Sequence, residues 1–269
     1  MNYSKAVKFN LSLYAGIILL VFYFPIICII IASLSKKRYF SFPFPWHELS
    51  LAWYGAALNS QQIKEYFLIS VKIASLSTIL SLIIGFFGAL AYARYNWPLR
   101  KSFQKIVLLP LFFPQTVLGL SLLLWYNFLN ITPSWQTAIL AHTVWIAPIA
   151  TLIISIQAFS QDDSLEEAAR DFGASRWQIL RWITFPSLLP GLISAACFCI
   201  LLSWGNFALS IFTTGADTSL PEWLYARMSS AYQPIVPAVG SLSVLAALSL
   251  VLIFLIFTHF KSRKTQTSN

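Results

Sequence analysis

The sequence predicts an all-α, polytopic membrane protein of a single domain, residues 1–269, with about six transmembrane helices. Of its 269 residues 58% are hydrophobic and only 10% are charged, too few charged side chains to cover a soluble globule of this size. The apolar residues are gathered in six runs, each long enough to cross the hydrocarbon core, which takes about 20 helical residues. Polar, basic or proline-containing segments separate the runs.

We expect the six spans at about residues 11–34, 66–93, 106–128, 136–158, 188–212 and 238–260. The first run follows a start that carries Lys5 and Lys8, as a signal peptide does, but it is too long for one and lacks a small-x-small cleavage site. It is therefore expected to stay as a membrane helix, in which Pro25 is tolerated. The segment 35–65 is rich in Trp and Tyr and broken by prolines, so we expect it to lie along the membrane interface.

The second and fourth spans each contain one basic side chain. Lys72 is the one Lys or Arg placed well inside a predicted span. It either extends from near the outer end of its helix to the headgroups, the interpretation we favour, or lines the path of a solute. His142 has no second His, Cys or carboxylate at metal-ligand spacing, so we expect a hydrogen-bonded core residue rather than a ligand.

The fifth span is interrupted near its middle by the polar and small run Ser203-Trp204-Gly205-Asn206. Such residues either allow helices to pack closely and hydrogen-bond, or open a polar surface onto a cavity. The connection 213–237 that follows is polar, and a helical piece is expected near residues 221–225.

An even number of spans places both termini on one side of the membrane, and the basic residues decide which side. With cytoplasmic termini, that side holds twelve of them: Lys5, Lys8, Arg94, Arg100, Lys101, Lys105, Arg170, Arg176, Arg181, Lys261, Arg263 and Lys264. The outer side then holds five: Lys36, Lys37, Arg38, Lys64 and Arg227. The excess predicts cytoplasmic termini, although the first three of these five locally favour the opposite orientation.

The loop between the fourth and fifth spans has the densest run of charge, and this orientation places it in the cytoplasm. Ser164 and Glu167 have the spacing of a capping box that starts a helix, and Ser175 and Gln178 repeat it. Between them Gly173 stands where a helix end favours a residue that tolerates positive φ. We therefore expect a hairpin of two short helices with a polar outer face.

This hairpin carries a family motif. The motif consists of Glu167-Ala168-Ala169, then Gly173 after three intervening residues, then Ile183-Thr184-Phe185-Pro186 after nine more. It resembles the EAA loop of binding-protein-dependent ABC importer permeases. The family pattern ends in Ile-x-Leu-Pro, so Phe185 is the one departure, and it remains apolar. We expect Pro186 and Pro190 to stop or kink the chain that follows.

The resemblance implies the fold of a type I ABC importer permease, with residues 159–186 as a cytoplasmic coupling-helix hairpin. It implies that the hairpin docks on the ATPase through Glu166, Glu167, Ala168, Ala169, Gly173, Ala174, Ile183 and Pro186. It also implies the partners: a cytoplasmic ABC ATPase dimer, a second permease subunit and a periplasmic or extracellular solute-binding protein, with the chain in the bacterial inner membrane. The alternative is an unrelated polytopic channel or membrane enzyme with a chance hairpin.

Over nearly the whole chain the sequence also resembles spermidine/putrescine permeases, through Leu51–Tyr54, Asn59–Arg94 and Thr213-Thr214-Gly215. This resemblance implies a polyamine carried by alternating access. Residues assigned to the solute path are Lys72, Trp204, Asn206 and Phe207. No predicted span contains Asp or Glu, so a dication would depend on aromatic faces and carbonyls. Lys72 favours the alternative, a phosphonate or another small anion.

The sequence lacks the motifs that ATP hydrolysis, other catalysis or metal binding would require. There is no GxxxxGK[ST] loop, so ATP hydrolysis is assigned to a partner, and no catalytic residue, metal site or cofactor is expected. Cys28, Cys197 and Cys199 lie in apolar runs without metal or redox spacing, which predicts small buried side chains and no disulfide. The basic residues that give the net charge of +9 are scattered at the ends of the apolar runs. This placement favours lipid headgroups over nucleic acid as their partner.

Overall fold

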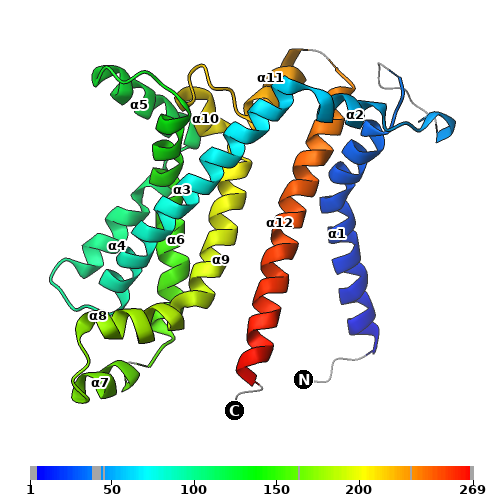
Figure 1. Cartoon of the computed structure of the whole chain (residues 1–269). Coiled ribbons are helices and arrows are strands. Elements are labelled where there is room, and N and C mark those ends of the chain that lie inside the picture. The colour runs from blue at the N-terminus through cyan, green and yellow to red at the C-terminus, as the bar shows by residue number, and fades with distance from the viewer. Residues whose placement is uncertain (1–4, 38–43, 45, 163, 231, 267–269) are drawn as a thin grey trace. The chain divides into compact units, whose positions relative to one another are not determined.

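The computed structural model describes residues 5–37, 44, 46–162, 164–230 and 232–266 (Figure 1). These residues are almost entirely helical, which confirms the all-α class. Five of their helices are long and apolar enough to cross a membrane: Phe9–Ser33, Gln61–Ala93, Trp135–Phe159, Arg176–Trp204 and Ile235–Ile256. A sixth candidate is a bent pair, Arg100–Phe112 and Gln115–Phe128. The predicted number of about six spans therefore stands.

The elements are α1 (Lys5–Ser33), η1 (Trp46–Glu48), α2 (Ala52–Asn59), α3 (Gln61–Ala93), α4 (Arg100–Leu108), η2 (Leu109–Phe112), α5 (Gln115–Phe128), α6 (Trp135–Phe159), α7 (Ser164–Asp171), α8 (Arg176–Ile179), η3 (Leu180–Thr184), α9 (Phe185–Trp204), α10 (Phe207–Thr213), α11 (Leu220–Ser230) and α12 (Ile235–Gln266). The chain divides into two compact units, one of residues 1–64 and 224–246 and the other of residues 65–223 and 247–269.

In the first unit, the predicted interfacial segment is fastened to the end of α1. Ser33 at that end hydrogen-bonds the Tyr54 hydroxyl of α2, and Trp53 Nε1 donates to the Ser35 carbonyl at 3.0 Å. α2 is therefore held by its own aromatic side chains. Cys28 on α1 is exposed, so the prediction of a buried thiol is wrong for this residue within the chain.

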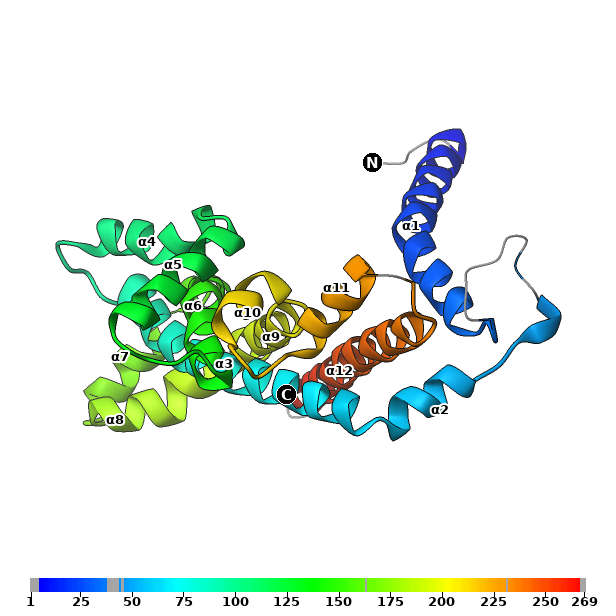
Figure 2. The same ribbon diagram turned by 90° about the horizontal axis from the view of Figure 1, so that it is seen from above.

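In the second unit, α6 is the core helix. Of its most apolar stretch 61% is buried, against 33% for α3. Seen from above, α6 lies among α3, α5, α9 and α10 (Figure 2). α3 lies so close to α6 at Gly85 that an added Cβ there would be only 2.8 Å from the Cβ of Ala150. Small residues thus let these two helices pack backbone to backbone.

The third span is not the single helix that we predicted at 106–128. The chain bends by 98° between η2 and α5. The cause is Pro114, because a residue before proline is pushed out of the helical region, and Phe113 has φ −85° and ψ 136°. The two pieces are a broken span or a re-entrant loop.

The fifth span breaks where its sequence predicted. α9 ends at Trp204, Gly205 caps it, and the short helix α10 starts after Asn206. At the first turn of α9, however, Pro186 does not stop the helix. Pro186 is the second residue of α9, which begins directly after the π-helical η3, and η3 joins α9 to α8 without a break. Figure 1 shows α8 lying across the direction of α9.

Candidate functional site

The hairpin 159–186 forms around its turn as the local sequence predicts. Gly173 has φ +81°, its N–H donates to the Arg170 carbonyl at 2.9 Å, and the Ala174 N–H donates to the Ala169 carbonyl at 3.0 Å. These two bonds make a Schellman motif, which needs a residue with positive φ. Both bonds of the predicted capping box of Ser175 with Gln178 are present at the start of α8.

The start of α7 differs from the prediction by one position. Ser164 is already the first helical residue, and its N–H donates to Asp162 Oδ1 at 3.1 Å. The predicted box of Ser164 with Glu167 is therefore wrong. The hydrogen bond from the Ser164 backbone N–H contributes most to lowering the pKa of Asp162, and the Ser164 hydroxyl contributes next. The lowered pKa favours the charged carboxylate beside the positive end of the helix.

The outer surface of the hairpin exposes large apolar side chains. Phe172 is 92% exposed, Trp182 71%, and Leu165 and Trp177 67% each. A surface of this kind usually marks a protein contact. Of the residues assigned to ATPase docking, those exposed are Glu167, Ala168, Gly173 and Pro186, and those partly buried are Glu166, Ala169, Ala174 and Ile183.

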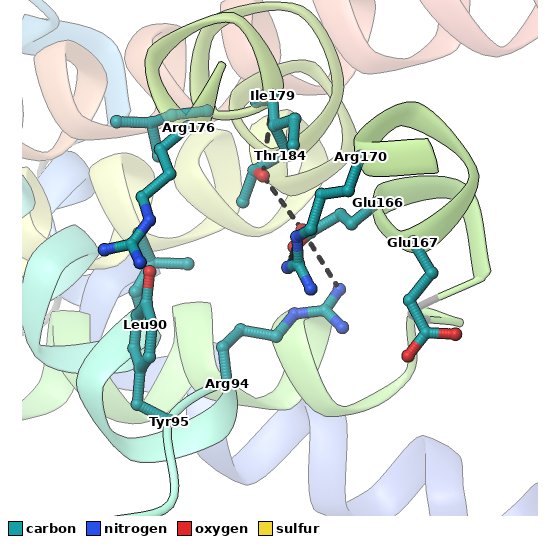
Figure 3. A pocket seen from close by; sticks show the side chains of 10 residues that line it. Leu90, Arg94, Tyr95, Glu166, Glu167, Arg170, Arg176, Ile179 and Thr184 are labelled. Carbon is teal, nitrogen blue, oxygen red and sulfur yellow. Dashed lines mark hydrogen bonds and ion pairs between the residues drawn. The ribbon is translucent and has the colours of Figure 1, made fainter. Parts of the chain in front are cut away.

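The two adjacent glutamates of the motif point in different directions. Glu166 is turned inward, and its side chain is 13% exposed. Its Oε1 accepts the Thr184 hydroxyl at 2.9 Å and lies 4.0 Å from an Arg94 nitrogen, while its Oε2 lies 3.4 Å from Arg170. Figure 3 shows Arg94 directed at this carboxylate and Glu167 directed away from it. The structure therefore places Glu167, not Glu166, where a partner can reach it.

These side chains line a pocket of about 470 Å³ between the hairpin and the end of α3. Its charged walls are Arg94, Arg170, Arg176, Glu166 and Glu167. Leu90 of α3 and Ile179 of α8 close it on the apolar side (Figure 3).

The residues assigned to the solute path gather at two places in the structure. At the break after α9, Trp204 packs edge to face on Phe67, with ring centroids 5.4 Å apart. Asn206 is buried and caps α10 through Oδ1, which accepts the Leu209 N–H at 3.1 Å. Its Nδ2 has no partner among the described residues. Phe207 is the first residue of α10 and half-buried.

Lys72 lies on α3 and is exposed. Its Nζ is 5.4 Å from the centroid of the Trp135 ring, a cation–π contact with the first residue of α6. The Trp135 N–H in turn donates to Asp217 Oδ2 at 3.0 Å. Lys72 is thus held near the first residue of α6, and its role in the path stays a prediction.

Beside the break lies a buried polar network around His142. His142 Nδ1 is 2.7 Å from the Ser203 hydroxyl, and Nε2 is 3.0 Å from the Ser210 hydroxyl, so the predicted hydrogen-bonded core histidine is confirmed. Because Ser210 donates its proton to the Asn206 carbonyl, it must accept from Nε2–H. Nδ1 is then the acceptor for Ser203. One neutral imidazole therefore ties α9 to α10 across the break.

Glu222 was missed because it lies outside every predicted span. It is buried at the start of α11, and its Oε2 accepts the Ser219 N–H at 3.0 Å. The Thr214 hydroxyl lies 2.8 Å from Glu222 Oε1 and 2.9 Å from the Ser210 carbonyl, but it has one proton. A protonated Glu222 that donates to Thr214 satisfies both contacts. Desolvation by burial accordingly raises the pKa of Glu222.

Comparison with known proteins decides the family. Residues 81–265 match the family described as "Binding-protein-dependent transport system inner membrane component". The chain belongs to this family. It is thus a multi-pass inner-membrane permease subunit of an ABC importer and not itself an enzyme, as the sequence predicted.

Individual relatives agree with this assignment. The spermidine/putrescine permease protein PotC of Haemophilus influenzae is 27% identical over 224 residues, covering 83% of this permease and 86% of the relative. The molybdenum permease protein ModB of Escherichia coli is 31% identical over 180 residues, covering 61% and 79%. A bacterial ABC transporter that imports alginate has a TM-score of 0.70 at 19% identity, covering 94% of this chain and 98% of that one, and shares the fold.

Proposed function

We propose that this permease carries a polyamine across the inner membrane by alternating access. The observation that carries the proposal is the similarity to the spermidine/putrescine permease protein PotC over 83% of the chain. The putrescine permease protein PotI of Escherichia coli, 27% identical over 82% of the chain, supports the same class of solute.

The chemistry of the solute path fits an organic cation through its aromatic side chains. The edge-to-face pair of Trp204 and Phe67 lies at the break after α9, and the Trp135 ring already holds an ammonium, that of Lys72. An alkylammonium is attracted to such ring faces by about 0.5–2 kcal/mol each, with the larger value where water is excluded. Lys72 opposes a cationic solute, because like charges repel.

A small anion is the second candidate, and two observations favour it. Lys72 supplies a positive charge near the outer loop, and the permease is 31% identical to the molybdenum permease protein ModB over 61% of its length. Uptake of radiolabelled putrescine by cells that lack and regain the gene separates the two. Inhibition of that uptake by excess spermidine supports a polyamine, whereas no uptake, or inhibition by phosphonate alone, favours the anion.

We further propose that the hairpin 159–186 docks on a cytoplasmic ABC ATPase dimer. Its exposed Phe172, Trp177 and Trp182 support a protein contact, and exposed Glu167 lies among the motif residues that the family resemblance assigns to it. The proposal includes cytoplasmic termini, a second permease subunit with its own hairpin, and a solute-binding protein at the outer face. Co-purification of the ATPase, and its loss when the exposed aromatic residues are replaced by Ser, is the test.

A further inference from the structure

The hairpin has covalent connections to only two of the long helices. α6 leads into it and η3 with α9 leads out of it, so both must follow any movement of the hairpin. α3 packs against α6 but is joined to the hairpin by no nearby stretch of chain. If α3 is to move with the hairpin, side chains at its cytoplasmic end must provide the connection.

We infer that Glu166 and Arg94 provide it, as an internal latch that fastens the end of α3 to the hairpin. Arg94 directly follows the last residue of α3, and its N–H still donates to the Leu90 carbonyl at 2.9 Å, as in a helix. Its guanidinium reaches to within 4.0 Å of Glu166 Oε1 on α7. Thr184 of η3 donates to the same oxygen at 2.9 Å.

One carboxylate oxygen thus joins three elements: α7 through Glu166 itself, η3 of the same hairpin through Thr184, and the distant α3 through Arg94 (Figure 3). The Thr184 bond sets the direction of the carboxylate, because the buried hydroxyl of Thr184 is fixed by η3. Arg94 and Thr184 are positioning residues, since they contact neither solute nor nucleotide in this scheme.

Burial distinguishes this pair from an ordinary surface ion pair. The side chains of Arg94 and Glu166 are 9% and 13% exposed, whereas that of Arg170, the other cation beside Glu166, is 60% exposed. An exposed pair adds little and is screened by salt, whereas a largely buried pair is screened much less. Of the two cations beside Glu166, Arg94 is the one that comes from outside the hairpin, so this ion pair joins the end of α3 to it.

The latch rests on the proposal that the hairpin receives the motion of the ATPase. With the latch closed, the hairpin and the end of α3 move together when ATP binds. With the latch open, the hairpin still moves α6 and α9, but α3 follows less closely. An opened latch should then lower the amount of solute imported per ATP while the ATPase stays bound and active.

Distance measurement tests the latch directly. Spin labels at Asn96 and Asp171, in a variant whose three cysteines are replaced by Ser, report the separation of the α3 end and α7 in the assembled transporter. The distance distribution should stay narrow and unchanged on ATP binding in the parent, and broaden or shift in Arg94→Met and Glu166→Gln. Unchanged distributions in both variants would overturn the latch, whatever the solute.

Transport measurement provides the functional test. In proteoliposomes with ATPase, second permease and binding protein, Arg94→Met should lower radiolabelled putrescine imported per ATP about tenfold, and the exchange Arg94→Glu with Glu166→Arg should restore part of it. Lys101→Met removes an exposed cytoplasmic charge outside the pocket and serves as matched control. A normal ratio in Arg94→Met contradicts the latch. Absence of putrescine uptake in the parent contradicts only the polyamine proposal, and the labels then decide the latch.

Discussion

Replacement of Gly173 isolates the backbone geometry of the hairpin from all of its side-chain contacts. A Cβ at this position would meet nothing within 4 Å, so a larger side chain causes no clash. The cost is confined to φ +81°, where an L residue is disfavoured by about 1–2 kcal/mol and a β-branched residue by more. Gly173→Val should therefore weaken the Schellman turn by about 2 kcal/mol or more, and Gly173→Asn by much less, because Asn visits this region.

At about 1.4 kcal/mol per factor of ten, a loss of about 2 kcal/mol lowers the equilibrium constant for forming the correct turn about 30-fold. We expect uptake to fall at least about tenfold in Gly173→Val and to stay close to that of the parent in Gly173→Asn, with Gly173→Ala between them. No span is changed, so all three variants should reach the membrane in equal amounts.

The assay compares initial uptake rates at equal membrane level of the permease, together with the amount of ATPase that co-purifies. The order Val, Ala, Asn is the signature of a positive-φ requirement, since side-chain volume alone would rank Asn as worse than Ala. Parent-like uptake in Gly173→Val, or equal damage from Val and Asn, would refute the argument that turn geometry matters for coupling.

Four further outcomes are expected. The raised pKa of Glu222 means that folding favours its protonated form, so thermal stability should fall as pH rises through that pKa, and Glu222→Gln should abolish this dependence. Gly215→Ala should destabilise the protein by more than Gly173→Ala, because its Cβ would lie 2.2 Å from the Pro133 carbonyl oxygen in addition to the positive φ; equal melting temperatures contradict this. A reporter fused at Gln161 should signal cytoplasm, and an outer signal would separate the hairpin from the ATPase. Lys72→Gln should raise putrescine uptake if the ammonium faces the path, and a lowered rate would favour the anion.

Features set by neighbouring residues could be predicted from the sequence. The turn at Gly173 and the cap of Ser175 with Gln178 need only a few residues at fixed spacing, so the pattern contains the geometry. The inward position of Glu166 could not be predicted in this way. Glu166 and Glu167 are adjacent, and the position of the end of α3 decides which of them faces the protein. That position cannot be predicted from the residues near the two glutamates.

The bend in the third span shows a second limit of sequence patterns. Hydropathy averages over a window, and the residues on both sides of Pro114 are apolar, so a helix bent by 98° scores like a straight one. Proline alone does not decide the matter, because α6 contains Pro148 and α9 contains Pro190 without a break. Membrane helices tolerate proline when neighbouring groups satisfy the freed carbonyls, and that depends on tertiary packing.

A carboxyl group near the proposed solute path is found in the folded structure but not by inspecting the predicted spans. The predicted spans contain no Asp or Glu, yet the folded chain buries Glu222, which follows Ser219 and Pro221 at the start of α11. Burial raises the pKa of Glu222, and its two oxygens already contact the Ser219 N–H and the Thr214 hydroxyl, so partners within the chain surround this carboxyl group. On the proposed path a polyamine meets aromatic faces, each of which attracts an ammonium by about 0.5–2 kcal/mol. This is the behaviour that a permease requires, since tight binding within the path would slow release into the cytoplasm.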